Sequence, residues 1–345
     1  MITPRVQLGG GRVVDLGIWR PAPYASQLLA ELGASVTKVE PPGGDPMRAF
    51  PALYEQLNSL KRVVELDLRS TAGRSALEPL LHDGDVLIEG FRPGVAARLG
   101  VGPDDVARVN PSMIHCSISG FGQDGPLAAV PGHDLNYQAW SGVLGARRPE
   151  TSVSGVPVAD LAGGAFAALA VCAALARRER SAARAGDATG ERIDVSMADV
   201  LVSWAGPEVG GSLAAGDRPG ANFPGYGTFR CLDGEITLGI VTEDRFWAGL
   251  CGVAGIDDAA DLDVAARAAT GPELRRRLDA AIALRRRDDV VDALLGAGVP
   301  VAPVLDRDEA VALEHFRVRG TVTDGTVGHP VRFTHPTPGT PGGAP

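Results

Sequence analysis

Two short segments of this 345-residue chain combine ionisable side chains with glycine, and their composition suits chemistry. Gly-His-Asp-Leu-Asn-Tyr at 132–137 contains His133, and Pro-Val-Ala-Asp-Leu-Ala-Gly-Gly at 157–164 contains Asp160. Glycine lets a backbone approach a ligand closely, and loops held by a rigid scaffold often carry function. An imidazole and a carboxylate facing one pocket suit a reaction in which a proton leaves one face of a carbon atom and returns to the other. The pair therefore predicts acid–base chemistry of the racemase type.

Composition sets the class of protein. A chain of 345 residues with 45% hydrophobic and 22% charged residues predicts a globular protein of two domains. We expect no membrane partner and a cytoplasmic location, because no apolar run reaches the length of a membrane span and the first residues lack a signal peptide. The net charge of −9 argues against nucleic acid as a main partner. The four cysteines lack CxxC spacing, so neither a disulfide framework nor a metal site is expected.

The hydrophobic pattern predicts an α/β fold followed by a smaller α+β domain. Helix-like stretches at 24–32 and 72–81 alternate with apolar runs typical of buried strands, which lie at 13–16, 36–39, 63–66, 86–88 and 113–118. Such alternation indicates a parallel sheet covered by helices. A buried helix is expected over 165–178, after Gly164, followed by a polar hinge at 181–190, a strand at 192–195 and a helix at 197–204.

The second half begins with a stretch at 206–225 that holds six glycines and three prolines, a composition typical of a linker. Segments 227–231 and 235–240 flank Leu-Asp-Gly and predict a β-hairpin, because Asp-Gly favours a tight hairpin turn. Helices are expected near 244–253 and 273–284. The tail beyond 336 is rich in Pro, Gly and Thr and is expected to fray.

One long segment, Gly-Ala-Ser-Val-Thr-Lys-Val-Glu-Pro-Pro-Gly-Gly-Asp-Pro at 33–46, resembles the opening of the class III CoA-transferase (CaiB/BaiF) family, which includes the α-methylacyl-CoA racemases. The resemblance covers nearly the whole chain, since it continues at 61–68, 85–94, 119–126, 233–234 and 299–305. It implies a Rossmann-like large domain over 1–205 to which 306–345 returns, and a small α+β domain over 226–305. It also implies a homodimer whose two chains interlock.

The resemblance also implies roles for the two ionisable residues. Asp160 matches the catalytic carboxylate, which is a nucleophile that becomes an anhydride in the transferases and an acid or base in the racemases. A purely structural alternative is that Asp160 caps the following helix. His133 stands in a string similar to that of the racemases, and its structural alternative is a local hydrogen bond that orders the loop.

Further residues complete the expected site. Backbone amides near Gly163 and Gly164, at the start of the helix after Asp160, are expected to stabilise the enolate oxygen, and tight helix packing is their structural alternative. Glu243 lies near the position of the racemase glutamate that partners the histidine. The spacing there is one residue longer than in the racemases, and a carboxylate favoured by the helix N-terminus explains Glu243 equally well.

CoA is expected to bind as part of the substrate, with no tightly bound cofactor. By position, the resemblance implies contacts from Leu66, Arg69, Arg92, Arg98, Lys38 and Arg20. Arg20 departs from both branches of the family, which have glutamine or glycine there. It either reshapes the acyl pocket or binds a polar acyl group.

The sequence therefore predicts an enzyme of acyl-CoA thioesters, foremost an α-methylacyl-CoA racemase or epimerase with His133 and Asp160 as its acid–base pair. The main alternative is a CoA-transferase in which Asp160 is the nucleophile. A third hypothesis is a catalytically inactive acyl-CoA-binding paralogue, suggested by Arg20 and the shifted Glu243.

Overall fold

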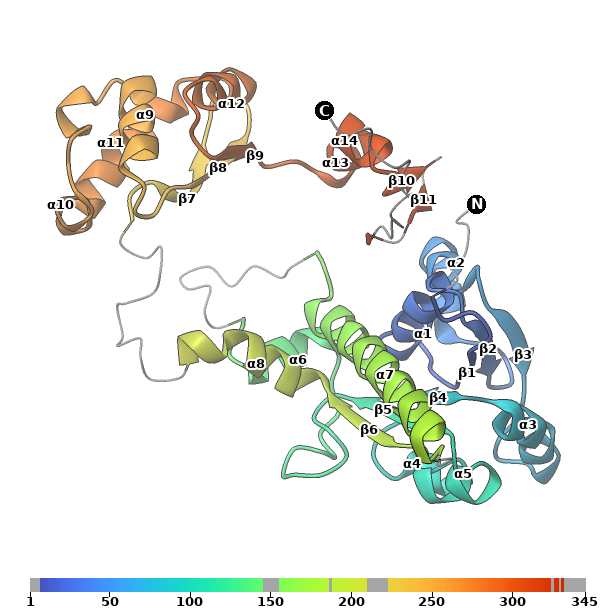
Figure 1. The fold of residues 1–345 in the computed structure, drawn as a ribbon. Helices are drawn as coiled ribbons and strands as arrows, with labels where there is room; N and C mark the ends of the chain where they lie inside the picture. The colour runs from blue at the N-terminus through green and yellow to red at the C-terminus, as the bar shows by residue number, and fades with distance from the viewer. Residues whose placement is uncertain are drawn as a thin grey trace, which may run out of the picture. The chain divides into compact units, whose positions relative to one another are not determined.

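The chain forms two compact units, which the computed structural model describes over residues 7–144, 155–185, 188–209, 223–323, 326–328 and 330–331 (Figure 1). The first unit comprises Met1–Gly206 and Thr321–Pro345, and the second comprises Pro207–Gly320. The return to the first unit thus begins at Thr321, later than the expected residue 306. The helices α13 (Arg307–Ala312) and α14 (Glu314–Val318) fall within the second unit instead.

A six-stranded parallel sheet organises the first unit, with the order β3-β2-β1-β4-β5-β6. Its strands are β1 (Arg12–Asp15), β2 (Ser35–Glu40), β3 (Arg62–Glu65), β4 (Val86–Glu89), β5 (Ile114–Ser119) and β6 (Arg192–Ser196). All strands run parallel, but the order in which the chain adds them to the sheet reverses between β1 and β4. Ligands of such sheets bind beyond the carboxyl ends of the strands at that switch point. The Rossmann-like α/β expectation is confirmed.

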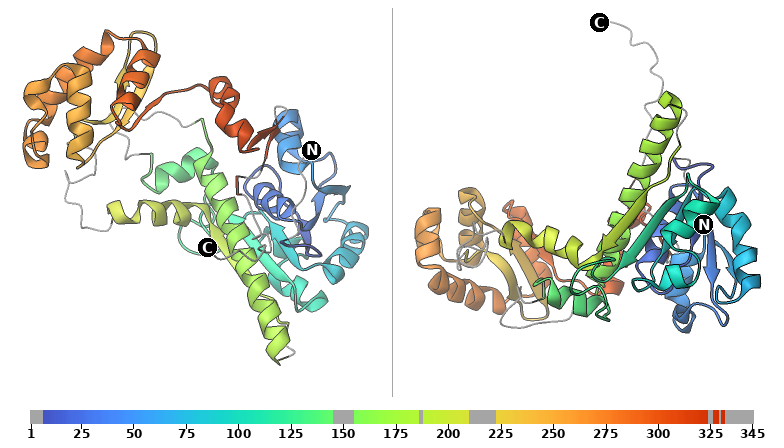
Figure 2. Two further views of the ribbon diagram at one scale, coloured as in Figure 1. Left: turned by 45° about the horizontal axis from the view of Figure 1, so that its top comes forward. Right: turned by 90° about the horizontal axis from the view of Figure 1, so that it is seen from below.

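Helices cover both faces of this sheet (Figure 2). The helices of the unit are α1 (Ala22–Glu31), α2 (Pro51–Asn58), α3 (Thr71–Asp83), α4 (Val95–Arg98), α5 (Pro103–Val109), α6 (Asp134–Trp140), α7 (Val158–Ala185) and α8 (Met197–Val209), with a 3₁₀ turn at Pro46–Ala49. Adjacent strand residues point to opposite faces, so Val13 packs in the core under α1 and α7, whereas Val14 packs with Leu77 of α3 on the other side. Burial on both faces explains the continuous apolar runs.

Helix α7 is longer than expected and begins at Val158, seven residues before the expected start. An 18-residue window within its stretch Val158–Arg184 has a mean hydropathy of 2.0, so by length and composition alone α7 could cross a membrane, contrary to the expectation from the sequence. Half of that window is buried inside the unit, where α7 packs against α1, α6 and β5. The buried half of this window is packed as in a core helix.

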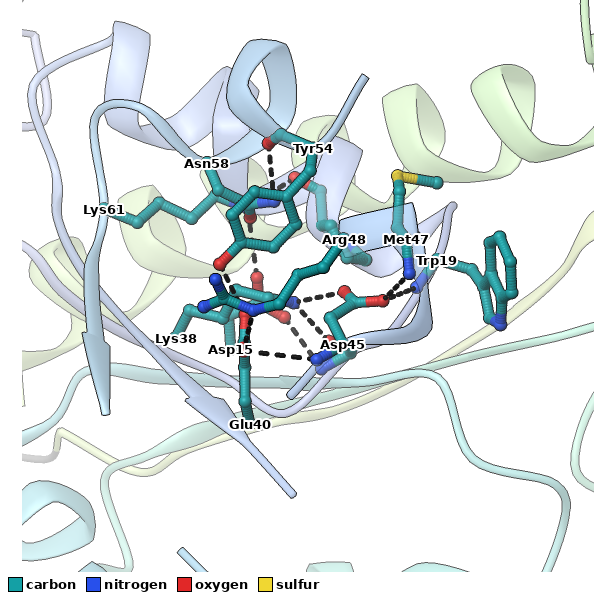
Figure 3. Close-up of polar contacts among 12 residues, drawn as sticks. Asp15, Trp19, Lys38, Glu40, Asp45, Met47, Arg48, Tyr54, Asn58 and Lys61 are labelled. Carbon is teal, nitrogen blue, oxygen red and sulfur yellow. Dashed lines mark hydrogen bonds and ion pairs between the residues drawn. The ribbon is translucent and has the colours of Figure 1, made fainter. Parts of the chain in front are cut away.

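A buried network of charges holds the loop that follows β1 (Figure 3). Lys38 Nζ lies 3.0 Å from Asp45 Oδ2 and donates to the carbonyl of Gly17 at 2.6 Å. Lys61 Nζ lies 3.1 Å from Asp15 Oδ2, and all four charged side chains are fully buried. A buried ion pair is stable only when further hydrogen bonds complete it.

Backbone amides complete the network and connect it to the loop. Asp15 Oδ1 accepts the N–H of Gly17 at 2.8 Å, and Asp45 Oδ1 accepts the N–H of Trp19 at 3.1 Å. Trp19 has a φ of 59°, an unfavourable backbone conformation for a bulky residue. These bonds therefore fix residues 17–19 in a conformation that their sequence alone would disfavour.

The second unit contains the predicted hairpin of β7 (Tyr226–Arg230) and β8 (Glu235–Gly239), to which β9 (Val301–Pro303) adds an antiparallel strand. Besides α13 and α14, its helices are α9 (Asp244–Ala254), α10 (Val264–Ala269), α11 (Gly271–Ala283) and α12 (Arg287–Gly296), with a 3₁₀ turn at Asp257–Ala259. Phe229, Ile236, Trp247 and Leu278 lie in its core. A short antiparallel pair, β10 (Val322–Thr323) and β11 (Thr326–Val327), follows in the chain and belongs to the first unit. Most of the expected linker, 210–222, and the tail from 332 lie outside the described residues.

We predict that Lys38→Met lowers the free energy of unfolding by about 3–5 kcal/mol, because it leaves Asp45 buried without its cation. Adding Asp45→Asn should recover part of the loss, since the uncompensated charge is then removed. The matched control is Arg62→Met, which removes an exposed cation from β3 and should change stability by less than about 0.5 kcal/mol. Urea unfolding measures all three, and equal effects at positions 38 and 62 would contradict the proposed importance of the network.

Candidate active site

A cavity of about 520 Å³ opens in the first unit beyond the carboxyl ends of β1, β4 and β5. Its wall comes from the loop after β1, the loop after β4, the end of β5, the segment 128–133 and the first residues of α7 and α8. Most lining side chains are apolar or small. The ionisable ones are Arg20, Arg92, His133, Tyr137 and Asp160. The structure thus brings His133 and Asp160 to one cavity, at the switch point of the sheet.

Asp160 lies in the first turn of α7 and is half-buried. Burial raises the pKa of its carboxyl to about 7, the negative charge of Asp134 acts in the same direction, and the Arg20 guanidinium partly opposes both. A carboxyl that titrates near neutrality can both donate and accept a proton under physiological conditions. Strongly perturbed acids in clefts are candidates for function on this ground.

Asp134 joins the two segments that carry the acid–base pair. Its Oδ1 accepts the backbone N–H groups of Ala159 at 2.6 Å and of Asp160 at 3.1 Å. These are amides that the first turn of a helix leaves without intrahelical partners. Asp134 therefore takes the helix-capping role considered for Asp160, whose own carboxylate remains at the cavity. The sequence analysis missed this function, although an acidic residue directly after His133 was its signal.

The other residues of the 132–137 string hold His133 in place. The His133 backbone N–H donates to Asn136 Oδ1 at 3.0 Å, and the hydroxyl of buried Tyr137 donates to the carbonyl of Gly132 at 2.6 Å. A Cβ at Gly132 or Gly120 would collide with the Tyr137 ring, so both positions require glycine. The ordering contacts are thus made by neighbours, and the imidazole is left exposed at the cavity.

The expectation for Gly163 and Gly164 needs correction. Because α7 begins at Val158, these glycines lie in its second turn, beyond the amides that a helix start leaves free. A Cβ at Gly163 would lie 2.7 Å from Met197 Cγ, and one at Gly164 would lie 2.8 Å from the carbonyl oxygen of Pro21. The two glycines allow α7 to pack closely, which was their structural alternative.

The expected CoA contacts are placed in three different environments. Arg20 and Arg92 line the cavity. Lys38 is fully buried in the charge network, so the expectation that it contacts CoA is corrected: it positions the loop 17–19 instead. Arg69 bonds to Asp67 at 2.9 Å, Arg98 is exposed on α4, and Leu66 packs in the core beside α3. These last three lie outside the cavity lining, and their contact with CoA remains a prediction.

Glu243 belongs to the second unit, directly before α9. Its Oε2 accepts the backbone N–H groups of Val241 and Thr242, each at 3.0 Å, and these bonds lower the pKa of the carboxyl. These contacts are local to the start of α9, and they agree with the alternative that Glu243 is a carboxylate favoured by the helix N-terminus. Its pairing with His133 remains a prediction. Among the described ranges, no group of three or more His, Cys, Asp and Glu side chains could hold a metal ion.

A carboxyl titrating near neutrality and an imidazole, both at the switch point of a parallel sheet, define an α/β enzyme site. The sequence profile of CoA-transferase family III matches residues 8–342, so the chain belongs to this family. It is 32% identical to an acetyl-CoA:oxalate CoA-transferase of Acetobacter aceti, over 98% of this chain and 93% of that protein. It is also 31% identical to the human α-methylacyl-CoA racemase, over 91% and 82%.

A solved structure agrees with this membership. The CAIB/BAIF family protein from Brucella suis superposes with a TM-score of 0.82 at 29% identity, covering 95% of this chain and 92% of that one. The relatives include both transferases and racemases, and the chain is an enzyme of one of these two kinds.

Asp160→Asn should change how stability depends on pH. The folded carboxyl keeps its proton up to a pKa of about 7, whereas an unfolded one loses it near 4. The folded state binds more protons in between, so wild-type stability falls as pH rises through this window. Asparagine does not titrate. The difference between pKa values of about 7 and 4 corresponds to about 4 kcal/mol, which solvent screening of the half-buried carboxyl reduces. Between pH 4 and pH 8 the variant should therefore gain on the order of 2 kcal/mol relative to wild type. Urea unfolding at pH 4 and pH 8 tests this, and a pH-independent difference would contradict it.

Proposed function

We propose that this protein is an α-methylacyl-CoA racemase that transfers a proton at the α-carbon of a CoA thioester. The observation that carries the proposal is the presence of His133 and Asp160 in one cavity, fixed relative to each other through Asp134. The racemases among its relatives, at 30–31% identity, are consistent with this reaction.

The reaction needs one base and one acid. The base removes the α-proton, and the electron pair of the C–H bond moves into the thioester carbonyl to give an enolate. The acid then returns a proton to the same carbon from the other face, and the two groups exchange roles in the reverse direction. Asp160 suits both roles because its pKa is about 7, and histidine is the side chain that ordinarily titrates closest to neutrality.

The enolate oxygen also needs a donor. The backbone amides of Gly163 and Gly164 lie in the second turn of α7 and are not free to donate to the enolate oxygen. The described side chains of the cavity wall that can donate include Arg20, Arg92 and the Ser119 hydroxyl, whereas the Tyr137 hydroxyl is committed to Gly132. A donor is most effective where charge develops in the transition state and water is excluded.

A CoA-transferase is the second candidate, favoured by the relatives that move CoA between acids. In that reaction the Asp160 carboxylate attacks the thioester carbonyl, CoA leaves as a thiolate, and a mixed anhydride forms on Asp160. Burial that raises the pKa also strips water from the carboxylate, so it suits a nucleophile as well. The role of His133 separates the two candidates, because the transferase mechanism needs no second base at the α-carbon.

For a racemase, 2-methylbutanoyl-CoA should take up α-deuterium in heavy water with no acceptor acid present. His133→Gln and Asp160→Asn should each lower racemisation by about 10²- to 10⁴-fold, because one of the two proton transfers is lost. Each variant should retain exchange on one enantiomer only. Chiral chromatography and mass spectrometry of the recovered thioester give both rates.

The matched controls are His82→Gln on α3 and Asp199→Asn on α8, which change exposed residues away from the cavity lining. Both should racemise as wild type does. Rapid transfer of CoA to a carboxylic acid without α-exchange would instead assign the protein to the transferases, with Asp160 as nucleophile.

We further propose a homodimer. Large apolar side chains of α6, α7 and α8 are exposed on the isolated chain, among them Trp140 (61%), Leu169 (65%) and Trp204 (53%). Exposed apolar surface of this kind is typical of an interface. Sedimentation at nanomolar concentration should show a dimer that does not dissociate without unfolding, as interlocked chains require. A folded, active monomer would overturn this proposal.

A further inference from the structure

Arg20 lines the cavity, and neither of the two proton transfers of the proposed reaction uses its guanidinium. It lies directly after Trp19 in the loop fixed by the charge network, and its side chain lines the cavity together with Asp160 (Figure 3 shows the support of this loop at Trp19). Its Nε is buried and has no hydrogen-bond partner among the described residues. A guanidinium does not deprotonate in proteins, so this donor stays charged and can bond an acceptor that a ligand brings into the cavity.

The charges of the cavity point to the nature of that acceptor. The wall carries two guanidinium groups, Arg20 and Arg92, whereas its one carboxyl among the described lining residues is Asp160. Burial holds Asp160 partly in its neutral form near pH 7. Asp160 therefore supplies less than one negative charge, and together with the neighbouring Asp134 it still falls short of the two fixed positive charges. A ligand that brings an anionic oxygen to Arg20 would balance the excess.

We infer that Arg20 binds a carboxylate of the substrate beside Asp160, and that the enzyme acts on acids with a second carboxylate group. This inference rests on the proposed function, because it places the acyl group at Asp160. The phosphates of CoA do not fit the role, since the pantetheine arm separates them from the thioester. A planar guanidinium recognises a carboxylate through paired hydrogen bonds, which neither the glutamine nor the glycine expected here from the family could supply.

The rigidity of the loop makes Arg20 a suitable specificity residue. Gly17 and Trp19 are held through Asp15, Lys38 and Asp45, all fully buried. Little conformational entropy of the backbone is then lost when a ligand binds. A buried polar group built to bond a ligand also rejects analogues that lack the partner, because it is left unpaired.

Equilibrium binding of two thioethers tests the inference independently of catalysis. S-(3-carboxypropyl)-CoA carries a terminal carboxylate, and S-butyl-CoA is its neutral counterpart; neither has a thioester that could react at Asp160. Wild type should bind the acidic thioether roughly 10- to 100-fold more tightly, measured by isothermal titration calorimetry. In Arg20→Gln this preference should fall to near one, and Arg20→Lys should retain part of it.

The controls separate a specific contact from general charge. Arg92→Gln removes the other cavity guanidinium and should leave the ratio of the two affinities unchanged. Thermal unfolding of each variant checks that it is folded. If the wild-type protein shows no α-deuterium exchange but still prefers the acidic thioether, only the proposed function is overturned, because the thioethers report binding and not catalysis.

A third measurement identifies the source of the carboxylate. If the acidic thioether has no advantage, but succinate binds in the presence of free CoA and Arg20→Gln abolishes that binding, the carboxylate belongs to a separate acid, as an acceptor would provide. If neither the thioether preference nor succinate binding depends on Arg20, the inference is wrong. Equal weakening of both thioethers in Arg20→Gln would also overturn it, because the contact would then not be with a carboxylate.

Discussion

The buried pairing of Lys38 with Asp45 and of Lys61 with Asp15 is the constraint on which the cavity depends. Four charges removed from water are tolerable only as a set, so the carboxyl ends of β1 and β2 and the following loops must stay together. Their remaining hydrogen-bonding capacity goes to the backbone of Gly17 and Trp19. The buried ion pairs thus fix the position of the loop that forms part of the cavity wall.

A second constraint is that one carboxylate serves two distant parts of the chain. Asp134 begins α6, next to His133, and its Oδ1 caps α7 at the turn that carries Asp160. The spacing of the two proposed proton-transfer groups is therefore set by a pair of short hydrogen bonds. Burial is the larger cause of the raised pKa of Asp160, and the charge of Asp134 adds to it, so the residue that positions Asp160 also increases its proton affinity.

The fold was largely predictable because its signals are local. The runs at Val13, Val36 and Val86 are apolar on both faces since helices cover both, and Gly33 has the positive φ that ends α1. The Asp-Gly turn likewise specified the hairpin of β7 and β8. The start of α7 was missed because its cap comes from Asp134, about one supersecondary unit upstream.

The site residues were predictable only where they lie in short segments with a recognisable sequence pattern. The string around His133 and the Asp160 segment met as expected. Lys38 was placed wrongly because its partners, Asp45 and the Gly17 carbonyl, are brought to it by the folded chain. A lysine in a strand shows nothing in its own sequence neighbourhood that distinguishes burial in an ion pair from exposure to ligand. The position of Gly163 depended in the same way on a contact with another helix.

The packing of Tyr137 against Gly120 and Gly132 has a consequence for how this cavity can evolve or be redesigned. The ring occupies the space that side chains at both glycines would need, and its hydroxyl holds the backbone of Gly132. Gly120 and Gly132 both contribute to the cavity wall. Enlarging either glycine therefore requires a smaller residue at 137, and that exchange would release the loop that carries the imidazole. The shape of this wall and the placement of the histidine are therefore coupled, and a substitution that changes one also changes the other.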